Sequence, residues 1–389
     1  MINGYVHPHF APLAVRFDKL FGKPKDGGGS ISAYLNGELV LDVWTGYADP
    51  QTRRPWERDT MALSFSTTKG VISTLLHRLV EQGLLTWDDR VADHWPDFAA
   101  AGKEGVTIRH VLTHTAGLHA VRPLVSEVEE LLDHRHMATL LAKAAPRPEP
   151  GAAPGYHGLT YGWLVAGLIE HVTGRDVRDV LREDLAEPME LDGLFFGAPE
   201  DQRGRLARLF PGVTPAGLAI ERLALRAERF DRTRSLVEAL LVDGFEKIVF
   251  DPSNRIYDAA MPAVNGVFTA RSLAKLYGAL ANRGQVGGLR LLQPETVTEI
   301  GRVQRRERDY VLGLPMRWRL GYHQAFTLGR RQNYAFGHFG YGGSGAWADP
   351  RTGLSLAFVT NRLGNATTPV GDGRLVRLGG QAIKLARGT

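Results

Sequence analysis

The chain has 389 residues, a formal net charge of +5 and no cysteine, with 43% hydrophobic and 23% charged residues. This composition is typical of a folded globular protein and excludes disordered and fibrous classes. The absence of cysteine excludes disulfides, thiolate metal sites and cysteine nucleophiles, so covalent catalysis would need another side chain. A charge of +5 over this length is too dilute to predict binding to nucleic acid.

Neither a secretion signal nor a membrane span is predicted. The first nine residues lack a basic start followed by an apolar core. No run approaches the roughly 18 consecutive apolar residues that span a bilayer. The densest basic run, residues 203–234, alternates Arg with apolar and acidic residues and predicts a solvated helix face. If Met1 is the natural start, we expect a cytoplasmic protein that does not bind a membrane.

The first hundred residues predict a hairpin and then a helix. Residues 30–43 alternate apolar and polar side chains around Asn36-Gly37, a strong two-residue hairpin turn. After Leu63 the apolar residues recur at three- and four-residue spacing, which predicts an amphipathic helix that ends near Gly83.

The rest of the chain predicts helices and then strands. In the middle third, the Pro- and Gly-rich loop 147–155 precedes a helix over 161–172, and residues 236–249 predict the last helix. In the final third we expect a helix over 270–282, antiparallel strands over 336–348 and 354–360, and a terminal helix from about 373.

This order of elements predicts an α+β fold in which helices flank an antiparallel sheet. We expect one domain formed by both chain ends, residues 1–80 and 250–389. A mainly helical domain, residues 81–249, would be inserted between them.

The search for a nucleophile proceeds by elimination. No serine lies in Gly-x-Ser-x-Gly; Ser344 comes closest, but residue 346 is Ala. There is no His-Glu-x-x-His, and the histidine pairs 7/9 and 134/136 have i, i+2 spacing in polar surroundings, which is typical of surface histidines. We therefore expect no metal and no cofactor.

The tetrapeptide Ser-x-x-Lys remains, and it occurs twice, as Ser66 with Lys69 and as Ser272 with Lys275. At this spacing the two side chains share one helix face, and at a helix start free backbone N–H groups lie nearby. Ser66 precedes the predicted helix among small polar neighbours, so we expect it to be the nucleophile. Ser272 is interpreted as a helix-capping residue with a solvent-facing lysine.

The motifs around Ser66 resemble a known group of enzymes. The Ser-Thr-Thr-Lys at 66–69, residues 106–118, Pro-Gly-Tyr at 154–156, residues 265–271 and Gly-His-Phe-Gly at 337–340 follow one another in family order. Together they resemble the β-lactamase-related serine hydrolases, which include class C β-lactamases, DD-peptidases and, as the most similar group, family VIII carboxylesterases. The resemblance spans nearly the whole chain and implies a β-lactamase/penicillin-binding-protein-like fold.

The resemblance implies a tyrosine proton shuttle beside Ser66 and Lys69. Tyr156 has the family's spacing to Gly162, whereas the alternative Tyr161 lies among apolar residues and is more typical of packing. An adjacent Lys69 ammonium would favour the phenolate of Tyr156. The third motif, His-Phe-Gly at 338–340, would stand where the family usually has Lys-Thr-Gly.

The resemblance also implies an oxyanion hole made of the N–H groups of Ser66 and Tyr341. We expect the substrate site to be lined by His157, His338, Phe339 and Gly340.

Two departures from the family pattern bear on the substrate. Gly158 stands where β-lactamases carry an asparagine, and His338 replaces the lysine that holds a substrate carboxylate. Both changes weaken recognition of a β-lactam, and an N-terminus without a secretion signal is consistent with this. We therefore expect a carboxylesterase that cleaves a small-molecule ester with a short acyl chain, with a homo-oligomer as an open possibility.

Other functions remain open at this stage. A β-lactamase, a D-aminopeptidase or an acyltransferase would keep the fold and change the acyl substrate. A non-catalytic binding protein on the same scaffold is a remote alternative, because such a protein would be expected to lose Ser66, Lys69 or Tyr156.

Overall fold

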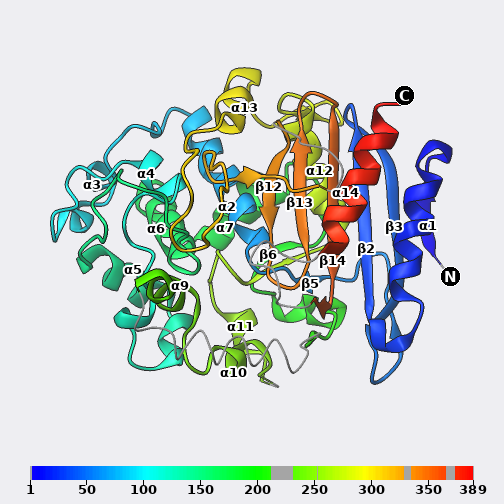
Figure 1. Cartoon of the computed structure of the whole chain (residues 1–389), viewed down its shortest axis with the longest axis horizontal. Helices are drawn as coiled ribbons and strands as arrows, with labels where there is room; N and C mark the ends of the chain where they lie inside the picture. The colour runs from blue at the N-terminus through cyan, green and yellow to red at the C-terminus, as the bar shows by residue number, and fades with distance from the viewer. Residues whose placement is uncertain (1, 212–230, 252, 328–333, 365–372, 389) are drawn as a thin grey trace.

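A central antiparallel sheet organises the molecule (Figure 1). The computed structural model describes residues 2–211, 231–251, 253–327, 334–364 and 373–388. Within these residues the sheet has eight strands in the order β1-β3-β2-β14-β13-β12-β11, with β4 paired to β3. Their bounds are β1 (Asn3–Val6), β2 (Gly28–Leu35), β3 (Glu38–Asp49), β4 (Arg54–Pro55), β11 (His323–Gln324), β12 (Phe336–Phe339), β13 (Gly345–Asp349) and β14 (Leu354–Thr360).

Strands from both chain ends therefore share one sheet, since β2 pairs antiparallel with β14. The turn between β2 and β3 has positive φ at both central residues, Asn36 (52°) and Gly37 (85°). Such a turn matches the twist of the two strands and fixes their register. The predicted hairpin and the predicted strand over 354–360 are both confirmed.

Helices cover both faces of the sheet. On one face lie α1 (Ala11–Asp18) and α14 (Gly373–Ala386), and α14 crosses in front of the strands in Figure 1. On the other face α12 (Ala270–Ala281) packs on β2, β13 and β14, while α2 (Thr67–Glu81) packs on β12. The cluster beneath α1 and α14 includes Phe10, Leu13, Phe17, Ile31, Val43, Phe358, Leu375, Leu378 and Ile383.

The remaining elements are shorter and lie mainly beside the sheet. The helices are α3 (Val91–His94), α4 (Ile108–Leu112), α5 (His134–Lys143), α6 (Thr160–Thr173), α7 (Val177–Leu181), α9 (Asp231–Leu240), α10 (Phe245–Val249), α11 (Arg255–Asp258) and α13 (Pro294–Gly301), with a π-turn at Arg182–Ala186. Short 3-10 turns lie at Pro8–Phe10, Lys19–Phe21, Pro24–Asp26, Pro96–Ala99, Arg122–Leu124, Val128–Leu132 and Glu200–Arg205.

Three small sheets complete the described structure. They are β5 (Ala62–Leu63) with β8 (Gly266–Phe268) and β6 (Leu194–Phe196), β9 (Gln285–Val286) with β10 (Leu289–Arg290), and β7 (Phe210–Pro211) with β15 (Arg362–Leu363).

The fold class predicted from the sequence is confirmed, but one predicted helix is wrong. Residues 236–249 form two helices, α9 and α10, rather than one. Gly244 between them has φ 84°, a left-handed conformation that cannot continue an α-helix. The division into domains at residues 80 and 250 stays a prediction. The helical face predicted for 203–234 falls largely on residues 212–230, outside the described residues.

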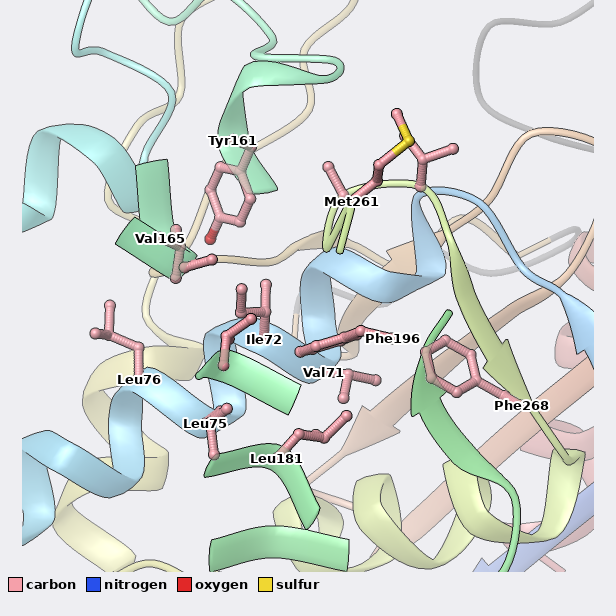
Figure 2. Packing of buried hydrophobic residues seen from close by; sticks show 14 of the residues in the cluster. Val71, Ile72, Leu75, Leu76, Tyr161, Val165, Leu181, Phe196, Met261 and Phe268 are labelled. Atoms are coloured by element: carbon pink, nitrogen blue, oxygen red, sulfur yellow. The ribbon is translucent and has the colours of Figure 1, made fainter. Parts of the chain in front are cut away.

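Helix α2 lies in the middle of the largest apolar cluster (Figure 2). Its side chains face α6 on one side and the small sheet of β5, β6 and β8 on the other. Because α2 is packed on several sides, its first turn has a fixed position. The residues shown include Val71, Ile72, Leu75 and Leu76 of α2 with Tyr161, Val165, Phe196 and Phe268 around them.

No helix of the described residues is long and apolar enough to cross a membrane.

The packing of α1 and α14 gives a stability test. Phe358 of β14 is fully buried, and its ring contacts those of Phe17 and Phe21. We expect Phe358→Ala to lower the free energy of unfolding by about 3–5 kcal/mol, because the cavity would lie where α1 and α14 meet the sheet. Val15→Ala on the exposed side of α1 is the control and should change it by less than about 0.5 kcal/mol. Denaturant unfolding measures both, and equal losses would contradict the packing described.

Candidate active site

The chain reaches Ser66 through a constrained turn. Ser64 donates its N–H to the carbonyl of Gly266 in β8 (2.8 Å), which ties the turn to the small sheet. The next residue, Phe65, has φ 46°, a left-handed conformation that is costly for a bulky residue and occurs often at functional sites. The chain then enters α2 with Ser66 at its N-cap position. Ser66 is partly exposed at the end of a buried helix.

The structure brings Ser66, Lys69 and Tyr156 together. Lys69 Nζ lies 2.9 Å from Ser66 Oγ, and the Tyr156 hydroxyl donates to the same oxygen at 2.8 Å. Lys69 and Tyr156 are buried, so Ser66 is the exposed member of the three. Ser66 stays partly exposed, while the two groups that can exchange protons with its Oγ are shielded from water.

Burial controls the charge of Lys69. Its Nζ also donates to the carbonyls of Gly158 (2.7 Å) and Ala263 (3.1 Å), and no carboxylate is among these partners. Burial therefore lowers the pKa of Lys69 well below its usual range. A neutral amine keeps two N–H donors for the two carbonyls and has a lone pair that can accept the Ser66 hydroxyl proton.

The expected phenolate of Tyr156 is wrong for the same reason. Burial raises the pKa of the Tyr156 hydroxyl, and the hydrogen bond to Ser66 offsets this only in part. The Nζ of Lys69 lies 5.0 Å from the centre of the Tyr156 ring, and burial lowers the pKa of this amine, which weakens its support for a phenolate. Tyr156 is thus a phenol that donates a proton toward Ser66.

The alternative tyrosine lies elsewhere. The Tyr161 hydroxyl is 2.6 Å from Ser73 Oγ, one turn further along α2 from Lys69. Burial raises the pKa of Tyr161 as well. The structure therefore places Tyr156, and not Tyr161, against Ser66.

The second Ser-x-x-Lys is built into the scaffold. The N-cap of α12 is Thr269 rather than Ser272, which corrects the interpretation from the sequence. Ser272 is buried in the first turn and donates its hydroxyl to the carbonyl of Asp192. Lys275 is not simply solvent-facing, because its Nζ lies 3.7 Å from Glu190.

The third motif lies along β12 and the turn that follows it. A side chain at Gly340 would place its Cβ 2.1 Å from the carbonyl oxygen of Ser64, so only glycine allows β12 this close to the Ser66 turn. Tyr341 is half exposed, and its ring edge contacts Phe65, the residue before Ser66 (5.6 Å between ring centres). The oxyanion hole of Ser66 and Tyr341 stays a prediction.

His338 lies beside Tyr156, with 6.3 Å between the ring centres and an interplanar angle of 27°. Burial lowers its pKa well below the usual range, so the ring is neutral. Its Nδ1 faces the carbonyl of Phe339 (3.3 Å), whereas its buried Nε2 has no hydrogen-bond partner in the described part of the chain. When Nδ1 carries the proton, Nε2 presents a lone pair.

Two of the expected lining residues do not present side chains to the site. Phe339 points to the other face of the sheet, where its ring packs on His323 and Phe326. His157 is fully buried, and backbone groups occupy both of its ring nitrogens: Nδ1 lies 2.7 Å from the carbonyl of Gly155, and Nε2 accepts the N–H of Leu118. Burial lowers the pKa of His157 to about 3. These two predictions are corrected: alternation along β12 turns Phe339 to the other face of the sheet, and contacts with Gly155 and the more distant Leu118 fix the ring of His157.

An apolar wall borders Tyr156, and sequence reasoning missed it. Trp318 stacks on Tyr156 at 5.7 Å, and Leu240 at the end of α9 packs in the same cluster. A Cβ on Gly158 would lie 2.2 Å from Leu240 Cδ2. The space that a side chain at 158 would occupy is therefore filled by a leucine 82 positions away, which no local motif reveals. The cluster contains Tyr156, Leu236, Ala239, Leu240, Tyr310, Val311, Leu312, Leu314, Met316, Trp318 and Phe326.

Asp309 is a second residue that sequence reasoning missed. It is fully buried and accepts hydrogen bonds from the backbone of Tyr156 and from the Trp318 indole. A sequence offers no signal for this pairing beyond an aspartate in a turn. Groups of three or more side chains able to hold a metal ion are not found in the described parts of the chain.

This geometry can be compared with known proteins. The Beta-lactamase family model matches residues 17–381. The chain belongs to the beta-lactamase family. The family resemblance inferred from the motifs is thus confirmed over nearly the full length.

Several known proteins are similar to this chain over most of their length. The protein "Esterase/beta-lactamase LipL" of Mycobacterium tuberculosis is 40% identical over 373 residues, which cover 93% of this chain and 83% of that protein. A structure described as a family VIII carboxylesterase is 32% identical with a TM-score of 0.85, over 99% of this chain and 100% of that one. A penicillin-binding protein homolog from Caulobacter crescentus is 33% identical with a TM-score of 0.84, over 99% and 100% of the two chains.

The two tyrosines give a test of the site. We expect Tyr156→Phe to slow hydrolysis of an ethyl ester by at least about 100-fold, the usual scale for losing a general acid–base group. Tyr161→Phe, the matched control, should keep the rate and instead lower stability by about 1–3 kcal/mol, because Ser73 loses a buried partner. Steady-state kinetics and thermal unfolding on both variants decide the matter. A silent Tyr156→Phe beside a damaging Tyr161→Phe would show that the wrong tyrosine has been chosen.

Proposed function

We propose that the protein hydrolyses carboxylic esters, with short acyl chains, through an acyl-enzyme on Ser66. The observation that carries this proposal is the position of Ser66 Oγ, partly exposed and within 2.9 Å of both the Lys69 amine and the Tyr156 hydroxyl. A nucleophile within hydrogen-bond reach of a base, with a second proton carrier beside it, is the arrangement that acyl transfer needs.

In the proposed first step the neutral Lys69 amine accepts the Ser66 hydroxyl proton as Oγ attacks the ester carbonyl. The carbonyl electron pair moves to its oxygen, and the N–H groups of Ser66 and Tyr341 hold the resulting oxyanion. When the tetrahedral intermediate collapses, Tyr156 donates its proton to the leaving alcohol and recovers one from the Lys69 ammonium. Water then repeats the sequence on the acyl-enzyme and releases the carboxylic acid and Ser66.

Two features support an ester over an anionic β-lactam. Leu240 and Gly158 leave no room for the amide-binding asparagine, and the neutral ring of His338 offers no charge to a substrate carboxylate. Neither feature changes the groups that carry out acyl transfer, which are Ser66, Lys69 and Tyr156. The names of the relatives, an esterase/beta-lactamase and a family VIII carboxylesterase, point in the same direction.

A weak β-lactamase activity is the second candidate, because the relative LipL carries both activities in its name. Transfer to an acceptor other than water is less well supported. Relatives named as acyltransferases, such as mokF of Monascus pilosus, are 30% identical over only 36% of this chain. A D-aminopeptidase, a non-catalytic protein, a cytoplasmic location and a homo-oligomer remain predictions from the sequence.

The nucleophile can be tested by labelling. We expect Ser66→Ala to abolish both ester turnover and labelling by a fluorophosphonate, because only Ser66 combines access with an adjacent amine. Ser272→Ala is the control and should keep both, since its hydroxyl serves the backbone of Asp192. Mass spectrometry of the labelled peptide identifies the adduct, and a phosphonyl group on any other serine would overturn the assignment.

The substrate class can be tested on one preparation. We expect the specificity constant for a short-chain p-nitrophenyl ester to exceed that for a chromogenic cephalosporin. A missing charge-assisted hydrogen bond to the cephalosporin carboxylate is worth roughly 1.5–3 kcal/mol, or about 10- to 150-fold. A ratio in favour of the cephalosporin would reject the esterase proposal and leave the Ser66 mechanism intact.

A further inference from the structure

Asp309 is a buried carboxylate surrounded by hydrogen-bond donors. Its Oδ1 accepts the backbone N–H groups of Tyr156 (3.2 Å), Val311 (3.0 Å) and Leu312 (2.9 Å). Its Oδ2 accepts the indole N–H of Trp318 (3.0 Å). The side chain lies in a loop between α13 and β11, far in sequence from Ser66.

These bonds hold Tyr156 from two directions. The bond from Oδ1 fixes the backbone of Tyr156, and a neighbouring bond from the Tyr310 N–H to the Pro154 carbonyl (3.0 Å) aligns the two loops. The bond from Oδ2 holds Trp318, whose ring lies 5.7 Å from the Tyr156 ring at an interplanar angle of 7°. Asp309 therefore sets both the position and the tilt of the ring whose hydroxyl reaches Ser66.

The charge state of Asp309 fits this role. Burial raises the pKa of Asp309 to about 6, while four N–H donors oppose the shift, so the ionised form dominates at neutral pH. All four partners are donors, so a protonated or amidated side chain would face at least one of them with a donor of its own. A buried donor left without an acceptor costs about 1–3 kcal/mol.

We propose that Asp309 is a positioning residue that holds the Tyr156 hydroxyl against Ser66 Oγ for proton delivery to the leaving alcohol. This inference rests on the esterase function proposed above. Asp309 acts through Tyr156 and Trp318 and does not itself touch the substrate.

The test measures how much Asp309→Asn lowers kcat/KM for an ester with a good leaving group and for one with a poor leaving group. A p-nitrophenolate leaves readily without a proton, whereas an ethoxide needs one. We expect Asp309→Asn to reduce kcat/KM for an ethyl ester by about 10- to 100-fold, the scale of a small misplacement of a catalytic group. The p-nitrophenyl ester of the same acid should lose much less. A residue that only stabilised the fold would slow both esters equally.

Two further variants sharpen the test. Adding Asp309→Asn to Tyr156→Phe should cause no further loss, since the positioned hydroxyl is already gone. Asp349→Asn is the matched control, because Asp349 is also buried with a raised pKa but bonds within its own turn, to the Arg351 N–H. It should leave the ratio of the two esters unchanged. If Asp309→Asn fails to fold, Trp318→Phe can replace it, because this change removes the indole donor to Asp309 and keeps an aromatic ring against Tyr156. The ethyl ester should again lose more activity than the p-nitrophenyl ester, but by a smaller factor.

The outcomes separate the two proposals. If wild type cleaves neither ester, or Ser66→Ala retains activity, the proposed function fails and the role of Asp309 fails with it. If wild type is active and Ser66→Ala is inactive, but Asp309→Asn slows both esters equally or adds to Tyr156→Phe, only the positioning role is overturned.

Discussion

The burial of the Lys69 amine is the interaction on which the rest of the site depends. Its Nζ contacts oxygen atoms from three parts of the chain, at Ser66, Gly158 and Ala263. An ammonium without a counter-charge costs several kcal/mol in such a place, so burial lowers the pKa of Lys69 and favours the neutral amine. The two carbonyls must then be fixed, because they accept hydrogen bonds from the buried amine. Packing of α2 against α6 and the small sheet provides that rigidity.

The same contact explains where Tyr156 lies. The carbonyl that accepts from Lys69 belongs to Gly158, two residues after Tyr156, so the turn that satisfies the amine also brings the phenol to Ser66. One short turn thus gives Lys69 a hydrogen-bond acceptor and brings Tyr156 to Ser66. The glycine at 155 takes part, since a Cβ there would lie 2.0 Å from the Tyr310 ring. The approach of the two loops therefore depends on a residue without a side chain.

Local patterns predicted the hairpin, helix α2 and the Ser66–Lys69 pair, whereas Tyr156 was predicted only from the resemblance to the family. The Asn36-Gly37 turn, the period of α2 and the Ser-x-x-Lys spacing are all properties of a few neighbouring residues. The features that sequence reasoning missed join distant segments. Asp309 bonds to Tyr156 across 153 positions, and His157 turns its Nε2 to Leu118, 39 positions earlier. The neutral Tyr156 could not be inferred either, because its pKa depends on burial that only the assembled fold creates.

The contact between Gly158 and Leu240 restricts how this site could change during evolution. An asparagine introduced at 158 would meet Leu240 and the carbonyl of Ala239, 2.7 Å from its Cβ, before it met any substrate. Conversely, shortening Leu240 alone would open a space that the glycine cannot use. An asparagine at 158 would therefore require Leu240 to move or be shortened and the backbone near Ala239 to shift.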